Sequence, residues 1–451
     1  MKVLSRLVPA AAAALAAAAF AAPAASASTE SHHPSPGAGN AVFVQTDSLE
    51  GNAAAAYHRA GNGTLTLAAT YPTGGLGGQL TGSVVDHLAS QGSLTYDRDH
   101  GLLYAVNAGS DTMSVFAASG DHLALRQVIS SGGSFPVSVT VHGDVVYVLN
   151  ALGGGSVYGY RVRGGQLSPI PGWLRGLGLD PSATPQFTHT PGQVAFTPDG
   201  SALLVTTKAN GNDVDVFAVG QDGLLSSSPV VNSESGAVPF AISFGQSGDV
   251  LIAEAGPNAL VSFSLADGGV LTAEHTALTG QMATCWVARA GQYSYASNAG
   301  SATVSGYRAG SGGQLTALGN TSTDAGTVDA ASTPSGQFLY VQAGGPGVVD
   351  EFAVGHGGSL AKIGSVTVAG AAGSRPGQDA AIPSPPAAPA TVTDPVLVRE
   401  PPWPTANSST APGPPAWTYR NRPDGVPAAS TVPASVEVLP SAVSSPPKPA
   451  W

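Results

Sequence analysis

The feature that most constrains the fold is a strand–loop–strand–turn–strand pattern that recurs seven times between residues 41 and 363. Two copies, GLLYAVNAGSDTMSVFAASGDHLAL (101–125) and YSYASNAGSATVSGYRAGSGGQLTAL (293–318), share nearly the same order of apolar and polar residues. One aromatic residue in the second strand of each copy anchors the count. These anchors are Tyr57, Phe116, Tyr160, Phe217, Phe263, Tyr307 and Phe352, with spacings of 59, 44, 57, 46, 44 and 45 residues. A base period near 45 residues indicates a repeat architecture.

One further strand precedes six of the copies and ends in a glycine-containing turn, as in VSVTVHG (137–143) and GQVAFTPDG (192–200). Each repeat therefore has four strands, termed A, B, C and D, which is the content of one β-propeller blade. The period-two alternation excludes a helical solenoid, and the alternative of one long β-sandwich would not repeat so regularly. The predicted fold is all-β, a seven-bladed β-propeller of four-stranded antiparallel blades.

The N-terminal residues predict export. Residues 1–27 begin with two basic residues, continue in an Ala/Leu-rich run and end in Ala-Ser-Ala, as a secretory signal peptide does. We expect cleavage after Ala27, a short linker over residues 28–40 and a secreted, extracellular protein. No other apolar run approaches the ~20 residues that a membrane span requires.

The C-terminal residues differ from the repeats. Residues 374–451 are rich in Pro, Ala and Ser and lack strand alternation, so we expect a disordered tail after a propeller that spans residues 41–373. The chain enters blade 1 at a strand B (41–48), so strand A of that blade must come from beyond blade 7. We predict that residues 378–382 (QDAAI) supply it and that the chain from Pro383 onward is dispensable.

Charge and cysteine content narrow the function. The chain has 17 Lys and Arg against 28 Asp and Glu, a formal net charge of −11. Such a scarcity of basic residues argues against nucleic acid as a partner. The single cysteine, Cys285, cannot form an internal disulfide, and its apolar neighbours favour a packed residue over a nucleophile.

Two insertions, at residues 71–91 and 168–190, lengthen two of the repeats. Both follow strand D of one blade and precede strand A of the next. Because strands alternate in direction, these D–A connections and the B–C loops emerge on the same face of the ring. Loops on a rigid scaffold commonly carry function, so we predict a binding site at this mouth of the central channel.

Polar residues end strand B in six blades and would surround that mouth. They are Asn107, Asn150, Lys208, Glu254, Asn298 and Gln342. An asparagine before Ala-Gly is also typical of a turn, so Lys208 and Glu254 carry more information. They lie on neighbouring blades, and we expect both to face the channel and to pair, which would lower the pKa of Glu254.

The insertions add three candidate site residues. His87 follows Asp86, and His189 lies near Asp180 in the sequence. A histidine beside a carboxylate can act as a general base, although a simple loop hydrogen bond is the common alternative. Trp173 is a candidate for a ligand-binding groove.

The stretches FTPDGSALLVTTKANGNDVDVFAV (196–219) and LLYAVNAGSDTMSVFA (102–117) resemble the YVTN-type repeats of the seven-bladed lactonase-like propeller family. That family includes bacterial 6-phosphogluconolactonases and fungal muconate-cycloisomerising enzymes. The resemblance covers roughly residues 40–370, and GGLGGQLTGSVVDHLASQGSLTY (74–96) is similar to a secreted actinobacterial branch. The resemblance implies the fold strongly and the activity weakly, because function depends on the site and not on the fold.

The family's expected catalytic motifs are altered here. The resemblance implies a Pro-His pair ahead of the Phe-x-Pro-Asp-Gly turn and Gly-Pro-Arg-His in the next blade. Here these places read Pro191-Gly192 and Val238-Pro239-Phe240-Ala241. Of an expected Asn-Glu pair at the end of strand B, only Glu254 is nearby.

Two functions therefore stay open. In the first, an exported propeller binds a small molecule or an extracellular protein at the channel mouth without the family's usual catalytic set. In the second, the chain is a sugar-lactone hydrolase in which Glu254 is the base and Lys208 or His189 its electrostatic partner. Convergence of these three side chains on one cavity would favour the enzyme. In both cases we expect a monomer without a cofactor or metal.

Overall fold

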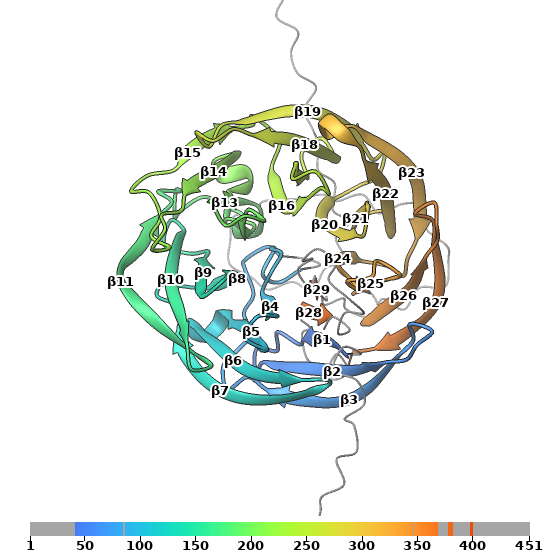
Figure 1. Cartoon of the computed structure of the whole chain (residues 1–451), viewed down its shortest axis with the longest axis horizontal. Helices are drawn as coiled ribbons and strands as arrows, with labels where there is room; N and C mark the ends of the chain where they lie inside the picture. The colour runs from blue at the N-terminus through green and yellow to red at the C-terminus, as the bar shows by residue number, and fades with distance from the viewer. Residues whose placement is uncertain (1–40, 84–85, 345, 369–377, 382–396, 400–451) are drawn as a thin grey trace, which may run out of the picture. The chain divides into compact units, whose positions relative to one another are not determined.

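Seven antiparallel sheets surround a central channel in the computed structural model of the chain (Figure 1). The structure describes residues 41–83, 86–344, 346–368, 378–381 and 397–399, all within the unit Pro36–Trp451. The predicted signal peptide and linker, and most of the predicted tail, lie outside the described residues. The prediction of a seven-bladed β-propeller with four-stranded antiparallel blades is confirmed.

The blades follow one another along the chain, and each runs from an inner to an outer strand. Blade 1 has β1 (Ala41–Gln45), β2 (Ala53–Arg59) and β3 (Leu65–Pro72), and blade 2 has β4 (Leu94–Asp97), β5 (Leu102–Asn107), β6 (Thr112–Ser119) and β7 (His122–Ser130). Blade 3 has β8 (Pro136–His142), β9 (Val145–Asn150), β10 (Ser156–Arg163) and β11 (Gln166–Gly176), and blade 4 has β12 (Val194–Phe196), β13 (Ala202–Thr206), β14 (Asp213–Ala218) and β15 (Val230–Ser233). Blade 5 has β16 (Pro239–Phe244), β17 (Val250–Glu254), β18 (Ala259–Leu265) and β19 (Leu271–Leu278). Blade 6 has β20 (Thr284–Ala290), β21 (Tyr293–Asn298), β22 (Thr303–Ala309) and β23 (Leu315–Ser322), and blade 7 has β24 (Thr327–Ser332), β25 (Phe338–Ala343), β26 (Val348–Val354) and β27 (Leu360–Thr367).

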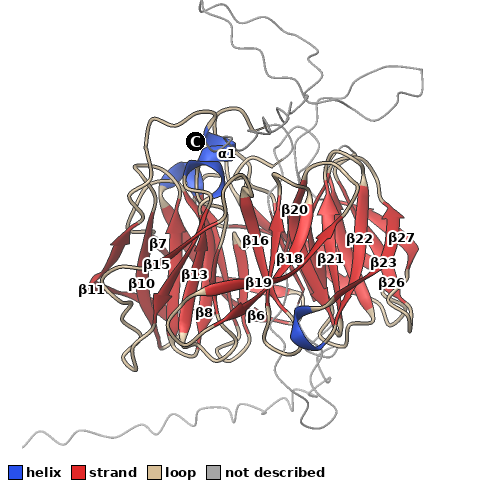
Figure 2. Cartoon of the chain, turned by 90° about the horizontal axis from the view of Figure 1, so that it is seen from above, coloured by secondary structure: helices blue, strands red, loops and turns tan. Residues whose placement is uncertain are grey.

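In the part of the chain that the structure describes, helical structure is confined to the connections. The helix α1 (Gln186–His189) lies in the second insertion, on one face of the ring (Figure 2). The single turns η1 (Ala108–Ser110), η2 (Lys208–Asn210) and η3 (Ser311–Gly313) lie in loops between strands. Within the described residues, no helix is long and apolar enough to cross a membrane.

Burial follows the position of a strand within its blade. The second strands β5 and β9 are buried along their whole length, because each is covered on both faces by neighbouring blades. The outermost strands β3 and β7 are largely exposed, with buried or half-buried positions between exposed ones. The alternation in the sequence is therefore the signature of blades whose outer edges meet water.

The seven anchor residues lie on the third strand of each blade, and none is more than 2% exposed. In five blades a β-bulge between the third and fourth strands falls directly before the anchor. A bulge increases the local twist of a strand pair, so the anchor aromatics mark the place where each blade bends toward its outer edge.

Hydrogen bonds from second-strand tyrosines join neighbouring blades. In three of these bonds the tyrosine hydroxyl donates to the carbonyl of a glycine in the turn between the third and fourth strands of the next blade. These pairs are Tyr147–Gly223, Tyr295–Gly358 and Tyr340–Gly63, with O···O distances of 2.9, 2.9 and 2.8 Å. Gly63 has a φ of 93°, and a Cβ there would lie 2.3 Å from the ring of Phe338, so only glycine fits.

The inner strand of blade 1 comes from the C-terminal part of the chain. The strand β28 (Gln378–Ala381) pairs with β1 in the register Val42↔Ala381, Phe43↔Ala380 and Val44↔Asp379. This confirms the predicted source of the strand, although Ile382 lies outside the described residues. A fifth strand, β29 (Leu397–Arg399), pairs with β28 within the segment expected to be disordered, and the strand pattern of the repeats did not predict it.

Truncation tests the closure of blade 1. A chain that ends after Ser384 retains β28, and we expect it to melt within about 2 °C of the full-length protein. A chain that ends after Gly373 exposes the inner edge of β1, so we expect its melting temperature to fall by roughly 5 °C or more. Differential scanning calorimetry measures both, and a chain that ends after Pro402 isolates the contribution of β29. Equal melting temperatures for the two shorter chains would exclude β28 as the closing strand.

Candidate functional site

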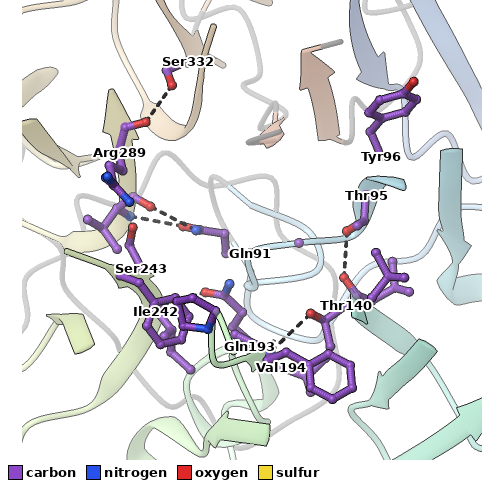
Figure 3. Close-up of a pocket in the computed structure, with 18 of the residues that line it drawn as sticks. Gln91, Thr95, Tyr96, Thr140, Gln193, Val194, Ile242, Ser243, Arg289 and Ser332 are labelled. Atoms are coloured by element: carbon purple, nitrogen blue, oxygen red, sulfur yellow. Dashed lines mark hydrogen bonds between the residues drawn. The ribbon is translucent and has the colours of Figure 1, made fainter. Parts of the chain in front are cut away.

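The end of the first insertion enters the central channel. Residues 86–91, here called the channel segment, are held by blades on opposite sides of the axis. Ser90 Oγ donates to Val137 O of blade 3 at 2.7 Å, and Gln91 N donates to Gly192 O ahead of blade 4 at 3.2 Å. The side-chain amide of Gln91 makes two hydrogen bonds with the backbone of Val287 in blade 6, at 3.0 and 3.1 Å (Figure 3).

Lys208 joins the channel segment to the second insertion. Its ammonium group donates to Ala89 O and Phe187 O, both at 2.7 Å, and to Thr190 Oγ1 at 3.1 Å. It also lies 5.3 Å from the ring centroid of Phe240, and the side chain is fully buried. Lys208 therefore faces inward as predicted, but these contacts give it a structural role.

Aromatic side chains complete this end of the channel. Trp286 Nε1 donates to Ser90 O at 3.1 Å, and the rings of Trp286 and Phe240 meet edge to face with centroids 5.0 Å apart. Leu88, Ala89 and Ser90 are at most 2% exposed. Described residues therefore fill the channel on the face where we expected its binding mouth.

The predicted asparagines end their strands as expected, but Asn107, Asn150 and Asn298 are fully buried. Asn107 Nδ2 donates to Ser114 Oγ at 2.8 Å, and Asn298 Nδ2 donates to Ser305 Oγ at 2.9 Å, each within its own blade. These two amides therefore link the second and third strands of their own blades.

Strand register distinguishes the remaining polar residues of the predicted ring. Counted from the residue opposite the anchor, Glu254 occupies the same position as the asparagines, whereas Lys208 lies one residue later and Gln342 one residue earlier. Gln342 is fully buried. Four of the six residues therefore share one position in their strands, whereas Lys208 and Gln342 do not.

Glu254 is a buried carboxylate at the end of β17. It is 7% exposed, and burial, followed by the negative charge of Glu234, raises the pKa of its carboxyl to about 7. The expectation that Lys208 lowers this pKa is wrong. A carboxyl with a pKa near 7 suits a general base, but Glu254 does not line the channel cavity described below.

His189 occupies a separate place. Its Nδ1 lies 2.8 Å from Thr188 Oγ1 and 3.0 Å from Pro185 O, within α1 and the turn before it. The side chain lines a cleft of about 10 Å³. Asp180, its neighbour in sequence, instead accepts hydrogen bonds from Ser182. The structure therefore does not bring His189, Lys208 and Glu254 to one cavity.

Two other candidates also lie away from an open cavity. His87 belongs to the channel segment and is 1% exposed. Trp173 lies on β11, the outermost strand of blade 3, which extends to Gly176 and is longer than expected. Its ring stacks on Tyr147 at 5.8 Å, and the Arg161 guanidinium lies over it at 5.4 Å. Trp173 therefore packs at the rim of the ring and forms no groove at the channel.

Cys285 has the packed role that its neighbours indicated. It contacts the hydrophobic core from β20, and burial raises the pKa of its thiol to about 12 even though the charge of Lys208 opposes the shift. A thiol with that pKa stays protonated at neutral pH, so it is not an activated nucleophile.

The channel cavity has a volume of about 220 Å³ and is lined from six blades (Figure 3). Its inner end is formed by Gln91 of the channel segment. Its lining also includes Pro198, Gly291 and Pro334, which lie in turns between first and second strands. These A–B turns are on the face opposite the B–C loops, so the cavity lies toward the opposite face from the predicted mouth.

Several polar side chains of this cavity join neighbouring inner strands. Thr95 Oγ1 donates to Val139 O at 2.7 Å, and Ser332 Oγ donates to Arg289 O at 2.6 Å. Gln193 Oε1 accepts from Ile242 N at 2.6 Å. The cavity therefore has a rigid wall, as a preformed binding site requires.

The sequence analysis missed Gln91, Gln193, Ser243 and Arg289, which line this cavity. They lie on or just before inner strands, whereas the predicted site residues lie in the insertions and at the ends of second strands. A usable signal was present, because Arg289 is the only charged residue in the inner strand TCWVARA.

Comparison with known proteins identifies the family. Residues 55–376 match the sequence model described as lactonase, 7-bladed beta-propeller. The chain belongs to this lactonase family. No curated protein is significantly similar to it in sequence.

Solved structures of lactonase-like proteins have the same fold. A proposed 6-phosphogluconolactonase from Bacteroides uniformis is 20% identical, covers 73% of this chain and 96% of its own length, and has a TM-score of 0.59. The periplasmic gluconolactonase of Pseudomonas aeruginosa is 18% identical, with coverages of 73% and 96% and a TM-score of 0.59. At these identities the similarity shows the fold alone.

The residues at the positions of the expected lactonase motifs make close packing contacts. At Gly192, where the resemblance implies histidine, a Cβ would lie 2.7 Å from Phe240 O and 2.9 Å from Thr206 Oγ1. At Phe240, where it implies arginine, the ring packs on Trp286. The backbone therefore leaves little room for a side chain at Gly192, and an apolar contact replaces a cation at Phe240.

The raised pKa of Glu254 predicts a pH-dependent stability effect. Folding favours the protonated carboxyl. Its contribution to the free energy of unfolding is therefore fully present below pH 4.5 and is lost as the pH rises through about 7. The loss is up to roughly 3 kcal/mol. We therefore expect Glu254→Gln to raise the melting temperature by about 3–8 °C at pH 8 and by much less at pH 5.

Thermal denaturation of both proteins at the two pH values measures this difference. Asp215, whose pKa burial and Asp213 also raise to about 7, is present in both proteins and cancels. Glu50→Gln, at an exposed loop position, is the control. An unchanged or lower melting temperature for Glu254→Gln at pH 8 would show that the Glu254 carboxylate is not destabilised by burial.

Proposed function

We propose that this protein is an exported, monomeric member of the lactonase family that binds a small polar molecule in its channel cavity. The observation that supports this most directly is the asymmetry of the channel. One end is filled by the channel segment, Lys208 and two aromatic rings, while polar side chains line the cavity toward the other. The volume of about 220 Å³ is below the range of drug-sized sites, so a small ligand fits.

The proposal includes the absence of the family's usual catalysis. Lactone hydrolysis needs a group that activates water and donors that stabilise an oxyanion. Gly192 and Phe240 provide neither at the places where the resemblance implies histidine and arginine.

A second candidate is sugar-lactone hydrolysis, favoured by one observation. The pKa of Glu254, raised to about 7, would let this carboxylate act as a base at neutral pH. Its proposed partners weaken the case, because Lys208 binds backbone carbonyls and His189 lies in another cleft.

A parallel screen of binding and turnover separates these functions. The purified protein, starting at Ser28, is titrated by calorimetry with sugars, polyols, hydroxy acids and sugar lactones, and lactone hydrolysis is followed by acid release. We expect binding of at least one class and no hydrolysis above the uncatalysed rate. Turnover that disappears in Glu254→Gln would establish the hydrolase instead, and a lack of any binding would reject the binding function.

A further inference from the structure

Arg289 is the only charged residue among the described residues that line the channel cavity. It lies half-buried on β20, and burial lowers the pKa of its guanidinium. An arginine nevertheless stays cationic in proteins. A partly desolvated cation in a wall without Asp or Glu is costly unless an anion compensates it.

The guanidinium is oriented by the backbone. Arg289 Nε donates to Gly291 O at 2.7 Å, in the turn that follows β20. This bond fixes one edge of the planar group and leaves the edge formed by the two terminal nitrogens for another acceptor. That edge matches the two oxygens of a carboxylate, which arginine binds with two parallel hydrogen bonds.

The neighbouring polar groups add donors to the same cavity. Because Gln193 Oε1 accepts from Ile242 N at 2.6 Å, the amide nitrogen of Gln193 is the free end of that side chain. Ser243, on β16 next to β20, contributes a hydroxyl to the cavity wall (Figure 3). The hydroxyls of Thr95 and Ser332, in contrast, donate to backbone carbonyls.

We propose that the cavity ligand is a small hydroxylated monocarboxylate, with its carboxylate on Arg289 and its hydroxyl groups toward Gln193 and Ser243. This inference rests on the proposed binding function. One arginine in a protein of net charge −11 balances one negative charge, which favours a carboxylate over a phosphate dianion.

Matched pairs of probes test the charge requirement. Glycerate and glycerol, threonate and threitol, and gluconate and glucitol differ within each pair mainly by the carboxylate, and they cover a range of sizes. Inorganic phosphate is the fourth anion. Titration calorimetry of the full protein should show at least one acid binding at least ~10-fold more tightly than its polyol.

Variants of Arg289 assign that difference to its guanidinium. Arg289→Gln should weaken the bound acid at least ~10-fold and leave the polyol unchanged, and Arg289→Lys should restore only part of the affinity. Arg308→Gln, which removes an exposed arginine from the same blade, is the control and should have no effect. Melting temperatures verify that each variant is folded.

Four results would overturn the inference. Polyols that bind as well as their acids, or an acid whose affinity survives Arg289→Gln, would reject the carboxylate site while the proposed binding function stands. Phosphate that binds more tightly than every acid would reject the preference for a carboxylate. If none of the four anions binds, the inference fails, and the wider ligand screen decides separately whether the binding function fails too.

Discussion

Closure of the ring is the constraint on which the rest of the structure depends. A blade buries its faces only against its neighbours, so blade 7 must pack on blade 1. Tyr340 OH donates to Gly63 O at 2.8 Å, and Leu65 N donates to the Glu351 carboxylate at 2.9 Å across that junction. The pairing of β28 with β1 adds the inner strand. Once the ring closes, the seven inner strands face one axis and create the channel.

The two ends of that channel then acquire different chemistry. At the insertion end, the ammonium group of Lys208 donates hydrogen bonds to two backbone carbonyls and a hydroxyl, and these bonds hold the channel segment. Removing that ammonium would leave the buried carbonyl of Ala89 and the partly buried carbonyl of Phe187 without this donor, which is costly in a protein interior. At the other end, Arg289 offers a cation to the cavity. A basic side chain therefore stabilises the fold at one end of the channel, and in our proposal another binds the ligand at the other end.

The fold was predictable because its signals are local. The anchor aromatics, the glycine turns and the two-residue alternation each reflect contacts within one blade, and they repeat seven times. The closing strand was predictable as well, since a missing strand A leaves an unpaired edge that few segments can fill. Trp173 was misplaced because residues 168–190 were assigned to an insertion after strand D, yet β11 extends to Gly176 as the edge strand of blade 3, where proline is tolerated.

The site was harder to predict, because the direction of an insertion depends on tertiary contacts. Nothing in the sequence around Gln91 shows that its amide will dock on Val287, almost two hundred residues away. With this contact the channel segment fills the insertion end of the channel, and the cavity lies toward the A–B turns. Arg289 was missed for a related reason: it is the only charged residue of its inner strand, but the sequence alone does not show which strand positions face the axis.

A crystal structure of the protein with its best-binding acid tests this account most directly. We predict density for the ligand in the cavity toward the A–B turns, with its carboxylate against the terminal nitrogens of Arg289 and the channel segment in place above it. Density at the insertion end, beside Glu254 or His189 and with residues 86–91 displaced from the channel, would contradict the account.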